Sequence, residues 1–561
     1  MQIIGNSIMI NVLASKDLML AEGSFMKTIK KEQMVFIIII MMQLISMVYW
    51  GTQKNGYYVD EFFTFDKAHY LSQSTPKRVK LYDADFLTYD EWHDISELKS
   101  TLTVTRDESL LADPAGYNLK MLITKSPYMA LLNYVQAVFF EGRLSKWSAI
   151  SINILFFLLN QIILYRLTLR ISEDRSAAIM TVMLYGFSGM AASMTVYVRF
   201  YMLITFWMTL YTYLHVLMWQ EDSIRKNLVM EFGAVAILYL AYKNSPLAVI
   251  QGVGVIGAFL VGLMMRKRYR QAVVYGLPVV GGGVMYVLLK TDYIGYVLHP
   301  EKFADADITN IATESLLENF LALTPGSAVD RSIELARLIC QYLFGHILVL
   351  GGYLLLASGL LILSLYTKRD KTKDADWKFF FLAVCPCAFY CVVSICLDLE
   401  VIRYNSSIFP ELAVCVCVFV MYLAGKSDRR RLAAVLMGII VLGQAAFTAY
   451  LPRVDYLYQD EKQAVEQIQS YQGIDSVVVD YHFDDKIMYE CLAFAREDTR
   501  VMFISNENID YGAWNNDILL WIRAGEGQEI IQKLAESGDY TVIEAGSTHE
   551  SDVYFVSKHV T

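Results

Sequence analysis

Long apolar segments alternate with short polar ones along most of the chain. About eleven of them approach the ~20 residues that an α-helix needs to cross a bilayer. They are residues 34–50, 148–168, 176–196, 201–219, 228–242, 246–265, 272–289, 341–366, 378–397, 407–424 and 431–450. A further apolar helix near 127–140 is too short to span and is expected to lie in the membrane interface. The pattern predicts a polytopic α-helical membrane protein.

The composition agrees with this fold class. Hydrophobic residues make up 55% of the 561 residues, and the mean hydropathy is +0.37, which is far too apolar for an ordinary soluble protein. The net charge of −9 gives no reason to expect a nucleic acid as partner. Residues 1–33 are expected to form an N-terminal extension.

Basic residues gather in four of the short polar segments. These are Lys27, Lys30 and Lys31; Arg266, Lys267, Arg268 and Arg270; Lys368, Arg369, Lys371 and Lys373; and Lys426, Arg429, Arg430 and Arg431. Alternation of about eleven spans puts all four clusters on one side, which the positive-inside rule identifies as the cytoplasm. The extension is therefore predicted to be cytoplasmic. A first loop (51–147), a second loop (290–340) and everything after residue 450 are predicted to lie outside.

Two of these extracytoplasmic segments have patterns of their own. Residues 451–561 alternate strand-like runs (476–480, 501–504, 517–522, 540–543 and 553–556) with helical stretches (459–471, 484–496 and 526–537). This alternation predicts a small α/β domain, which serves in acceptor binding or as a structural lid. Residues 71–119 are rich in acids and aromatics and are predicted to form a solvated pair of surface helices, with an acceptor-facing role as the alternative.

An acidic pair lies just beyond the first span, among aromatic residues. Asp60 and Glu61 stand within the sequence Tyr57-Tyr-Val-Asp-Glu-Phe-Phe-Thr64. Carboxylates are costly to remove from water unless they are paired or used in chemistry, so these neighbours indicate a partly buried pocket. An acidic turn beside an aromatic interfacial belt is the alternative.

Further polar residues are predicted at the same membrane depth. They are Arg199 and Tyr201 between the third and fourth spans, Lys243 and Asn244 after the fifth, Arg403 and Tyr404 before the tenth, and Lys125 and Ser126 at the start of the short helix. Each cation alone could be a snorkelling anchor. However, the positive-inside bias disfavours cations there. Since Arg binds phosphate oxygens with a planar fork, the convergence near an acidic pair suggests a site for a phosphate on a lipid tail.

The chemistry of such a site follows from its ligand. A glycosyl phosphate already carries a good leaving group, so the protein must neutralise the departing phosphate and deprotonate an acceptor hydroxyl. Asp60 is the predicted base, with Glu61 orienting it, holding a metal or bonding the sugar. A hydrolase with two separated acids fits less well, because adjacent residues rarely present that geometry.

These motifs resemble the glycosyltransferase C superfamily, in particular the polyprenyl-phosphate-sugar-dependent branch that includes protein O-mannosyltransferases (glycosyltransferase family 39). The resemblance runs from about residue 34 to about residue 425. The acidic motif matches Val59-Asp60-Glu61 with Thr64. A pattern ending in Ala-Arg-x-Tyr matches Arg199 and Tyr201, with Val198 replacing the usual small residue, and a late Arg-Tyr matches Arg403 and Tyr404 followed by Pro410.

Two positions depart from the family pattern. Lys125-Ser126-Pro127 stands where His-Pro-Pro is frequent, and Lys243-Asn244 stands where a His-Tyr pair is frequent. By analogy both touch the donor, so Lys125, Ser126 and Asn244, together with Tyr58, are assigned to a donor or acceptor pocket. Arg199, Tyr201, Lys243, Arg403 and Tyr404 are assigned to the donor phosphate.

The resemblance implies an inverting, mannosyltransferase-like hexosyltransferase in the plasma membrane of a bacterium. Its donor is a polyprenyl-phosphate sugar on the outer leaflet, and its acceptor is a protein, a lipid or an envelope polymer. No cofactor is predicted, and a divalent cation is an open alternative because metal dependence varies across the superfamily. The competing hypothesis is a flippase or transporter of lipid-linked sugars, which would distribute charges through its spans rather than at one end.

Overall fold

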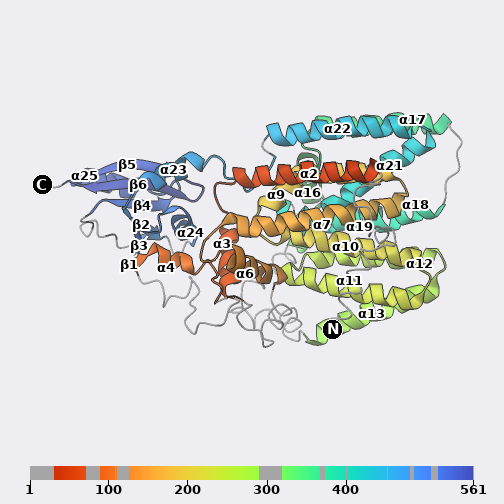
Figure 1. Cartoon of the computed structure of the whole chain (residues 1–561), viewed down its shortest axis with the longest axis horizontal. Helices are drawn as coiled ribbons and strands as arrows, with labels where there is room; N and C mark the ends of the chain where they lie inside the picture. The colour runs from red at the N-terminus through yellow and green to blue at the C-terminus, as the bar shows by residue number, and fades with distance from the viewer. Residues whose placement is uncertain are drawn as a thin grey trace, which may run out of the picture. The chain divides into compact units, whose positions relative to one another are not determined.

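The structure is a computed structural model of the whole chain (Figure 1). It describes residues 31–70, 89–107, 109, 126–289, 319–366, 373–399, 401–451, 453–480, 485–506, 509, 514 and 516–559. The chain divides into two compact units, and the second unit begins at Ser46. In the first, the described residues form the start of helix α2 (Lys31–Gln53), and the predicted extension up to residue 30 lies outside the described part. All other elements belong to the second unit.

Helices cover most of each predicted span. In the described residues, eight helices are long and apolar enough to cross a membrane, and a ninth span results if the bent pair α8 (Arg175–Gly186) and α9 (Gly189–Val196) counts as one. Two further predicted spans are α11 (Ile224–Asn244) and α13 (Tyr269–Leu289), which do not meet the same test of apolar composition. The prediction of a polytopic helical protein is confirmed, with eight or nine clear spans in place of about eleven.

The bundle is built around α10 (Tyr201–Gln220), which packs against α7 (Lys146–Ser172), α11 and α12 (Ala248–Met265). Figure 1 shows α7, α10 and α11 running side by side. In α10, 83% of the apolar 18-residue stretch is buried inside the protein. In α17 (Ile347–Tyr366) only 17% of the corresponding stretch is buried. An apolar helix that is exposed in this way is suited to contact lipid, so α10 is central and α17 peripheral.

The remaining spans lie around this centre. α21 (Phe409–Lys426) packs against α8 and α17, and α22 (Arg430–Tyr450) packs against α8, α17 and α21. Another span is broken into α18 (Lys373–Phe379), a π-helical turn η2 (Phe380–Val384) and α19 (Cys385–Leu397). Pro386 follows the π turn, and such irregular turns accommodate a proline that cannot donate a helical hydrogen bond.

Several shorter helices lie at the ends of the spans. α3 (Val59–Tyr70) carries the acidic pair and packs against α6 (Pro127–Phe139). The prediction of a short apolar helix near 127–140 is confirmed, since 13 residues form α6. α16 (Pro325–Leu343) occupies part of the predicted second loop, where a Thr324–Ser327 capping box and Pro325 start the helix.

The predicted α/β domain is present after the last span. Its strands are β2 (Asp475–Asp480), β3 (Arg500–Ser505), β4 (Ile518–Arg523), β5 (Tyr540–Ser547) and β6 (Ser551–Lys558), and its helices are α23 (Lys462–Ser470), α24 (Asp485–Phe494) and α25 (Gln528–Ser537). The sheet order is β1-β3-β2-β4-β6-β5, with β2 parallel to both β3 and β4 and the outer pairs antiparallel. All five predicted strands and all three predicted helices are confirmed.

The sixth strand comes from the first loop. β1 (Trp92–Asp94) pairs antiparallel with β3, and α4 (Ile95–Ser100) follows with Ile95 and Leu98 buried. The prediction of solvated helices is therefore wrong for this part, because β1 covers an edge strand that would otherwise expose unpaired backbone groups. Residues 71–88, 108 and 110–119 lie outside the described part of the chain.

Candidate functional site

The acidic pair begins a helix, which gives its two members different surroundings. Asp60 and Glu61 lie in the first turn of α3, where the helix dipole favours negative charge. Successive helical residues point about 100° apart. One carboxylate therefore faces the protein interior while its neighbour faces a partly open space.

Glu61 is the enclosed member and has no solvent exposure. Its carboxylate accepts hydrogen bonds from Lys54 Nζ at 2.9 Å and from the backbone N–H groups of Tyr58 at 2.7 Å and Val198 at 2.6 Å. Burial raises the pKa of Glu61 and lowers that of Lys54, and their opposite charges oppose both shifts. Glu61 thus ties the start of α3 to Lys54 and to the turn before α10.

Asp60 is about one quarter exposed. Its Oδ2 accepts a hydrogen bond from the Tyr197 hydroxyl at 3.2 Å and lies 3.7 Å from Arg403 Nη1 and 3.9 Å from Arg199 Nη2. Its Oδ1 has no hydrogen-bond partner among the described residues. A carboxylate fixed at one oxygen and open at the other can take a proton from a bound hydroxyl.

Arg199 is fastened to the same helix. Its Nη1 donates to the backbone carbonyl of Asp60 at 2.7 Å and to Thr64 Oγ1 at 3.3 Å, while its Nε is buried and has no hydrogen-bond partner among the described residues. The turn that presents Arg199 is held from the bundle side, because Asn153 Nδ2 donates to the carbonyls of Thr195 at 3.2 Å and Tyr197 at 2.7 Å. A guanidinium held in this way is oriented before any ligand arrives.

Arg403 approaches Asp60 from the short helix α20 (Ile402–Asn405). Its guanidinium carbon lies 5.3 Å from the centroid of the Tyr58 ring and 5.2 Å from that of Tyr404. Its Nε, like that of Arg199, is buried and finds no hydrogen-bond partner in the part of the chain that the structure describes. Two guanidinium groups beside a single carboxylate leave a net positive charge and unused N–H donors, which suit a phosphate group.

A stack of tyrosine rings closes one side of this cluster. The rings of Tyr197 and Tyr456 lie 3.9 Å apart and are tilted by 10°, and Tyr201 stacks on Tyr197 at 5.7 Å. Tyr456 comes from residues 453–461, the connector between the last span and the α/β domain. Lys54 Nζ donates to its carbonyl at 2.7 Å.

Tyr197, Tyr456 and Lys54 are not among the site residues predicted from the sequence. The spacing of Tyr197 from Arg199, two residues apart, was a usable signal. Lys54 and Tyr456 are 402 positions apart in the sequence, so no local pattern could have joined them.

The other predicted residues form a second group. Ser126 Oγ donates to Asn244 Oδ1 at 2.8 Å, and the backbone N–H of Tyr128 lies 3.3 Å from the same oxygen, so Asn244 caps the start of α6. Lys243 Nζ lies 5.5 Å from the centroid of the Tyr239 ring. Among the described residues, neither Lys243 nor Asn244 contacts Asp60. Lys125 lies outside the described part of the chain.

Comparison with known proteins bears on the architecture around this site. No protein-family model and no curated protein sequence matches the chain. Two crystal structures of ArnT from Cupriavidus metallidurans match it in three dimensions. The form bound to undecaprenyl phosphate is 11% identical, with a TM-score of 0.51 over 92% of this chain and 97% of that chain. The apo form is 12% identical, with a TM-score of 0.50 over 93% and 98%.

The chain has the glycosyltransferase C fold. This agrees with the superfamily resemblance found in the motifs. At such low identity the likeness concerns the fold alone, and it gives no information on family 39 or on mannosyl transfer. Asp60, Arg199 and Arg403 meet at the end of the bundle where α3 packs against α24 of the α/β domain.

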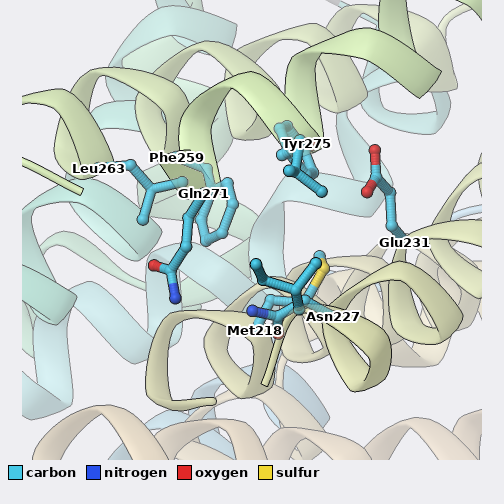
Figure 2. A pocket seen from close by; sticks show the side chains of 9 residues that line it. Met218, Asn227, Glu231, Phe259, Leu263, Gln271 and Tyr275 are labelled. Atoms are coloured by element: carbon cyan, nitrogen blue, oxygen red, sulfur yellow. The ribbon is translucent and has the colours of Figure 1, made fainter. Parts of the chain in front are cut away.

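A small cavity lies inside the helical bundle. Figure 2 shows a cavity between α10, α11, α12 and α13, with Met218, Asn227, Glu231 and Tyr275 among the side chains that line it. Its volume is about 20 Å³, which holds about one water molecule and is far too small for a sugar. Among the described residues there is also no group of three or more His, Cys, Asp and Glu side chains that could hold a metal ion.

Proposed function

We propose that the protein is a membrane glycosyltransferase that moves a sugar from a polyprenyl-phosphate donor to an acceptor hydroxyl. The observation that carries this proposal is the placement of Asp60, which lies within 4 Å of both Arg199 and Arg403 and keeps one carboxylate oxygen open. The fold supports it, since one of the matching ArnT structures is bound to undecaprenyl phosphate. The cluster combines a base with an anion site, and the transfer needs both.

The reaction uses these groups in one displacement. Asp60 accepts the proton of the acceptor hydroxyl while its oxygen attacks the anomeric carbon of the sugar. The bond from that carbon to the phosphate oxygen breaks, and its electron pair leaves with the polyprenyl phosphate. Arg199 and Arg403 neutralise the phosphate as it departs. Attack opposite the leaving group inverts the anomeric configuration.

Glu61 receives a different role from that of Asp60. It is enclosed by Lys54 and two backbone N–H groups, so it orients the start of α3 and thereby Asp60. Tyr201, which stacks on Tyr197, and Tyr404, which lies against Arg403, are assigned with the two arginines to the phosphate site. Lys243 is assigned with the arginines to the donor phosphate. Tyr58, whose ring lies 5.3 Å from the Arg403 guanidinium carbon, is assigned with Lys125, Ser126 and Asn244 to a donor or acceptor pocket.

The finer features of the proposal come from the motifs and the charge pattern. The site faces the outside of a bacterial plasma membrane, because the basic loops define the cytoplasmic side. Resemblance to the family 39 enzymes favours a hexose such as mannose as the transferred sugar. The acceptor hydroxyl belongs to a protein, a lipid or an envelope polymer.

The test is sugar transfer by the purified protein from polyprenyl-phosphate donors to a crude envelope acceptor. We expect the wild type to release polyprenyl phosphate and Asp60→Asn to stay folded but lose activity by 10²-fold or more, as is typical for a lost general base. Asp475→Asn is the matched control, since Asp475 also pairs with an arginine, Arg500 at 2.6 Å, but in the sheet of the α/β domain. Normal turnover by Asp60→Asn would refute the assignment of the base. Failure of the folded wild type to bind any lipid-phosphate sugar would refute the function.

A further inference from the structure

We infer that Tyr456 is a positioning residue of this transfer, so that the active site is incomplete without the connector of residues 453–461. The inference rests on the proposed function. The connector leads into the α/β domain and contains none of the residues of the acid–arginine cluster, which are Asp60, Arg199 and Arg403. The inference gives this connector a role in the chemistry. Tyr456 stacks on Tyr197 beside the cluster, its connector is hydrogen-bonded to the bundle, and its backbone has a left-handed φ angle.

Tyr456 reaches the proposed base through one intermediate side chain. Its ring is stacked on that of Tyr197 at 3.9 Å, and the Tyr197 hydroxyl donates to Asp60 Oδ2 at 3.2 Å. Tyr58 lies edge-on to both rings, at 6.4 Å from Tyr197 and 6.2 Å from Tyr456. Because Tyr197 is fully buried and Tyr456 is half-buried, Tyr456 covers Tyr197 and limits the orientations of its hydroxyl.

The connector is fixed along its length by the elements that build the site. Asp455 N donates to Ser193 Oγ of α9 at 2.9 Å, and the Asp455 carboxylate accepts from the Tyr342 hydroxyl at 2.8 Å. Lys54, which holds Glu61, also donates to the Tyr456 carbonyl at 2.7 Å. The backbone N–H of Asn55 donates to the Leu457 carbonyl at 2.7 Å. One buried ammonium thus fixes both the acidic helix and the connector.

The backbone of the connector is held in an unfavourable conformation. Tyr456 and Tyr458 both have left-handed φ angles, of 64° and 51°, which are uncommon for bulky residues. Such residues persist where the surrounding contacts determine the backbone, and they gather at functional sites. Here the left-handed turn at Tyr456 places its ring on Tyr197 while its carbonyl meets Lys54.

Close approach of other segments keeps the connector in place. A Cβ atom added to Gly56 would lie 2.1 Å from Glu461 Oε2 and 2.7 Å from the Cβ of Tyr458. At Gly189 an added Cβ would lie 2.2 Å from the Arg453 carbonyl oxygen. Two positions of the bundle end therefore accommodate only glycine without a shift of the connector. The contacts at both ends and at the middle of the connector all favour one position of Tyr456.

The test compares kcat and KM for the polyprenyl-phosphate sugar in wild type, Tyr456→Ala and Tyr456→Phe. We expect Tyr456→Ala to lower kcat by about ten- to a hundredfold, because misplaced catalytic groups cost this much. KM should change by less than about threefold, since the arginines that bind the phosphate are retained. Tyr456→Phe keeps the ring stack and the backbone contact and loses only the hydroxyl beside Arg403, so it should restore kcat.

The matched control is Tyr471→Ala, which removes another stacked tyrosine, 5.0 Å from Phe555, in the α/β domain. It should lower the melting temperature but leave kcat within about twofold, since only misplacement at the reacting centre is costly to rate. A parallel loss of kcat in Tyr471→Ala and Tyr456→Ala would overturn the inference. So would a normal kcat in Tyr456→Ala.

Tyr197→Phe provides a second test with almost no change in volume. If Tyr456 acts through the Tyr197 hydroxyl, the double variant Tyr197→Phe/Tyr456→Ala should lose no more kcat than the worse single variant. If instead the kcat losses of the two single variants multiply in the double variant, the inference is overturned. In the same assay, an inactive wild type or an active Asp60→Asn would refute the proposed function and this inference with it, whereas a normal Tyr456→Ala beside an inactive Asp60→Asn would refute the inference alone.

Discussion

The Lys54 ammonium lies 2.9 Å from the Glu61 carboxylate, and neither side chain is exposed to solvent. Each group has further partners, the Tyr456 carbonyl for Lys54 and two backbone N–H groups for Glu61. Removing two charges from water is costly, and only such additional hydrogen bonds make a buried pair tolerable. The pair therefore joins three segments that are distant in sequence at one point behind Asp60.

Lys54→Met should be strongly destabilising. The substitution keeps most of the side-chain volume but leaves the buried Glu61 carboxylate without its cation, which costs about 3–5 kcal/mol in comparable sites. Denaturant unfolding of the protein in detergent measures this. Lys462→Met is the control, because Lys462 pairs with Glu466 at 3.9 Å on an exposed helix surface, where such a pair contributes at most about 1 kcal/mol. Equal effects of the two substitutions would contradict the structural role of the buried pair.

Arg403→Lys should weaken donor binding although it preserves the charge. Lysine lacks the planar fork and the stacking on the faces of Tyr58 and Tyr404, so we expect KM for the donor to rise about tenfold or more. Steady-state kinetics with a polyprenyl-phosphate sugar measures the change. Arg500→Lys is a close control, since Arg500 pairs with Asp475 and lies 5.0 Å from the Trp92 ring, away from the cluster. An unchanged KM in Arg403→Lys would argue against a phosphate at this position.

Asn153→Leu should impair both folding and turnover. Asn153 donates to the buried carbonyl of Thr195 and, together with the Arg199 backbone N–H, to that of Tyr197, and a buried carbonyl left unpaired costs about 1–3 kcal/mol. The turn that carries Tyr197 and Arg199 should loosen, so kcat should fall in the fraction that remains folded. Asn160→Leu is the control two turns along the same helix, because neither polar atom of that buried amide has a hydrogen-bond partner in the described residues. Its replacement should be neutral or stabilising.

The fold could be predicted from the sequence wherever one segment determines its own structure. The apolar runs and the alternating strand pattern depend on neighbouring residues, and the structure confirms the helices and the tail strands that they predicted. β1 could not be predicted in this way. Trp92–Asp94 is only three residues long, and it is a strand because β3, some 400 residues away in the chain, offers a free edge.

The site could be predicted in part for the same reason. Asp60 is predicted because an acidic pair lies among aromatic residues, and Arg199 and Arg403 because the positive-inside bias disfavours cations on their side; the structure brings the three together. The difference between Asp60 and Glu61 could not be read from an adjacent pair. It arises because Lys54 and the Val198 N–H enclose one carboxylate, and these contacts exist only in three dimensions.

Glu461 should make stability depend on pH. Burial, followed by the nearby charge of Glu490, raises its pKa from 4.5 to about 8, against smaller opposing effects of the His549 N–H and Lys54. Between about pH 4.5 and pH 8 the folded protein then holds a proton that the unfolded chain releases. The contribution of Glu461 to the free energy of unfolding is therefore fully present below about pH 4.5 and is lost as the pH rises to about 8.

Glu461→Gln should remove this part of the pH dependence. The amide oxygen can still accept the His549 N–H, and no charge develops at high pH. We expect the variant to gain on the order of 2 kcal/mol relative to wild type between pH 5 and pH 8, measured as the change of Tm with pH. Glu466→Gln, at an exposed position, should leave the slope unchanged. Parallel curves for wild type and Glu461→Gln would show that Glu461 is ionised throughout.

Gly189→Ala should displace the connector while the helical bundle stays folded. The new Cβ would lie 2.2 Å from the Arg453 carbonyl oxygen, so the connector must shift, and Tyr456 lies three residues further on. We expect kcat to fall about tenfold or more with little change in donor KM, since small displacements of catalytic groups reduce rate more than binding. Gly438→Ala is the control, because no atom of the described residues lies within 4 Å of the added Cβ and alanine favours a helix by up to about 1 kcal/mol. Full activity in a folded Gly189→Ala protein would mean that transfer tolerates a displaced connector, and the role assigned to Tyr456 would then be wrong.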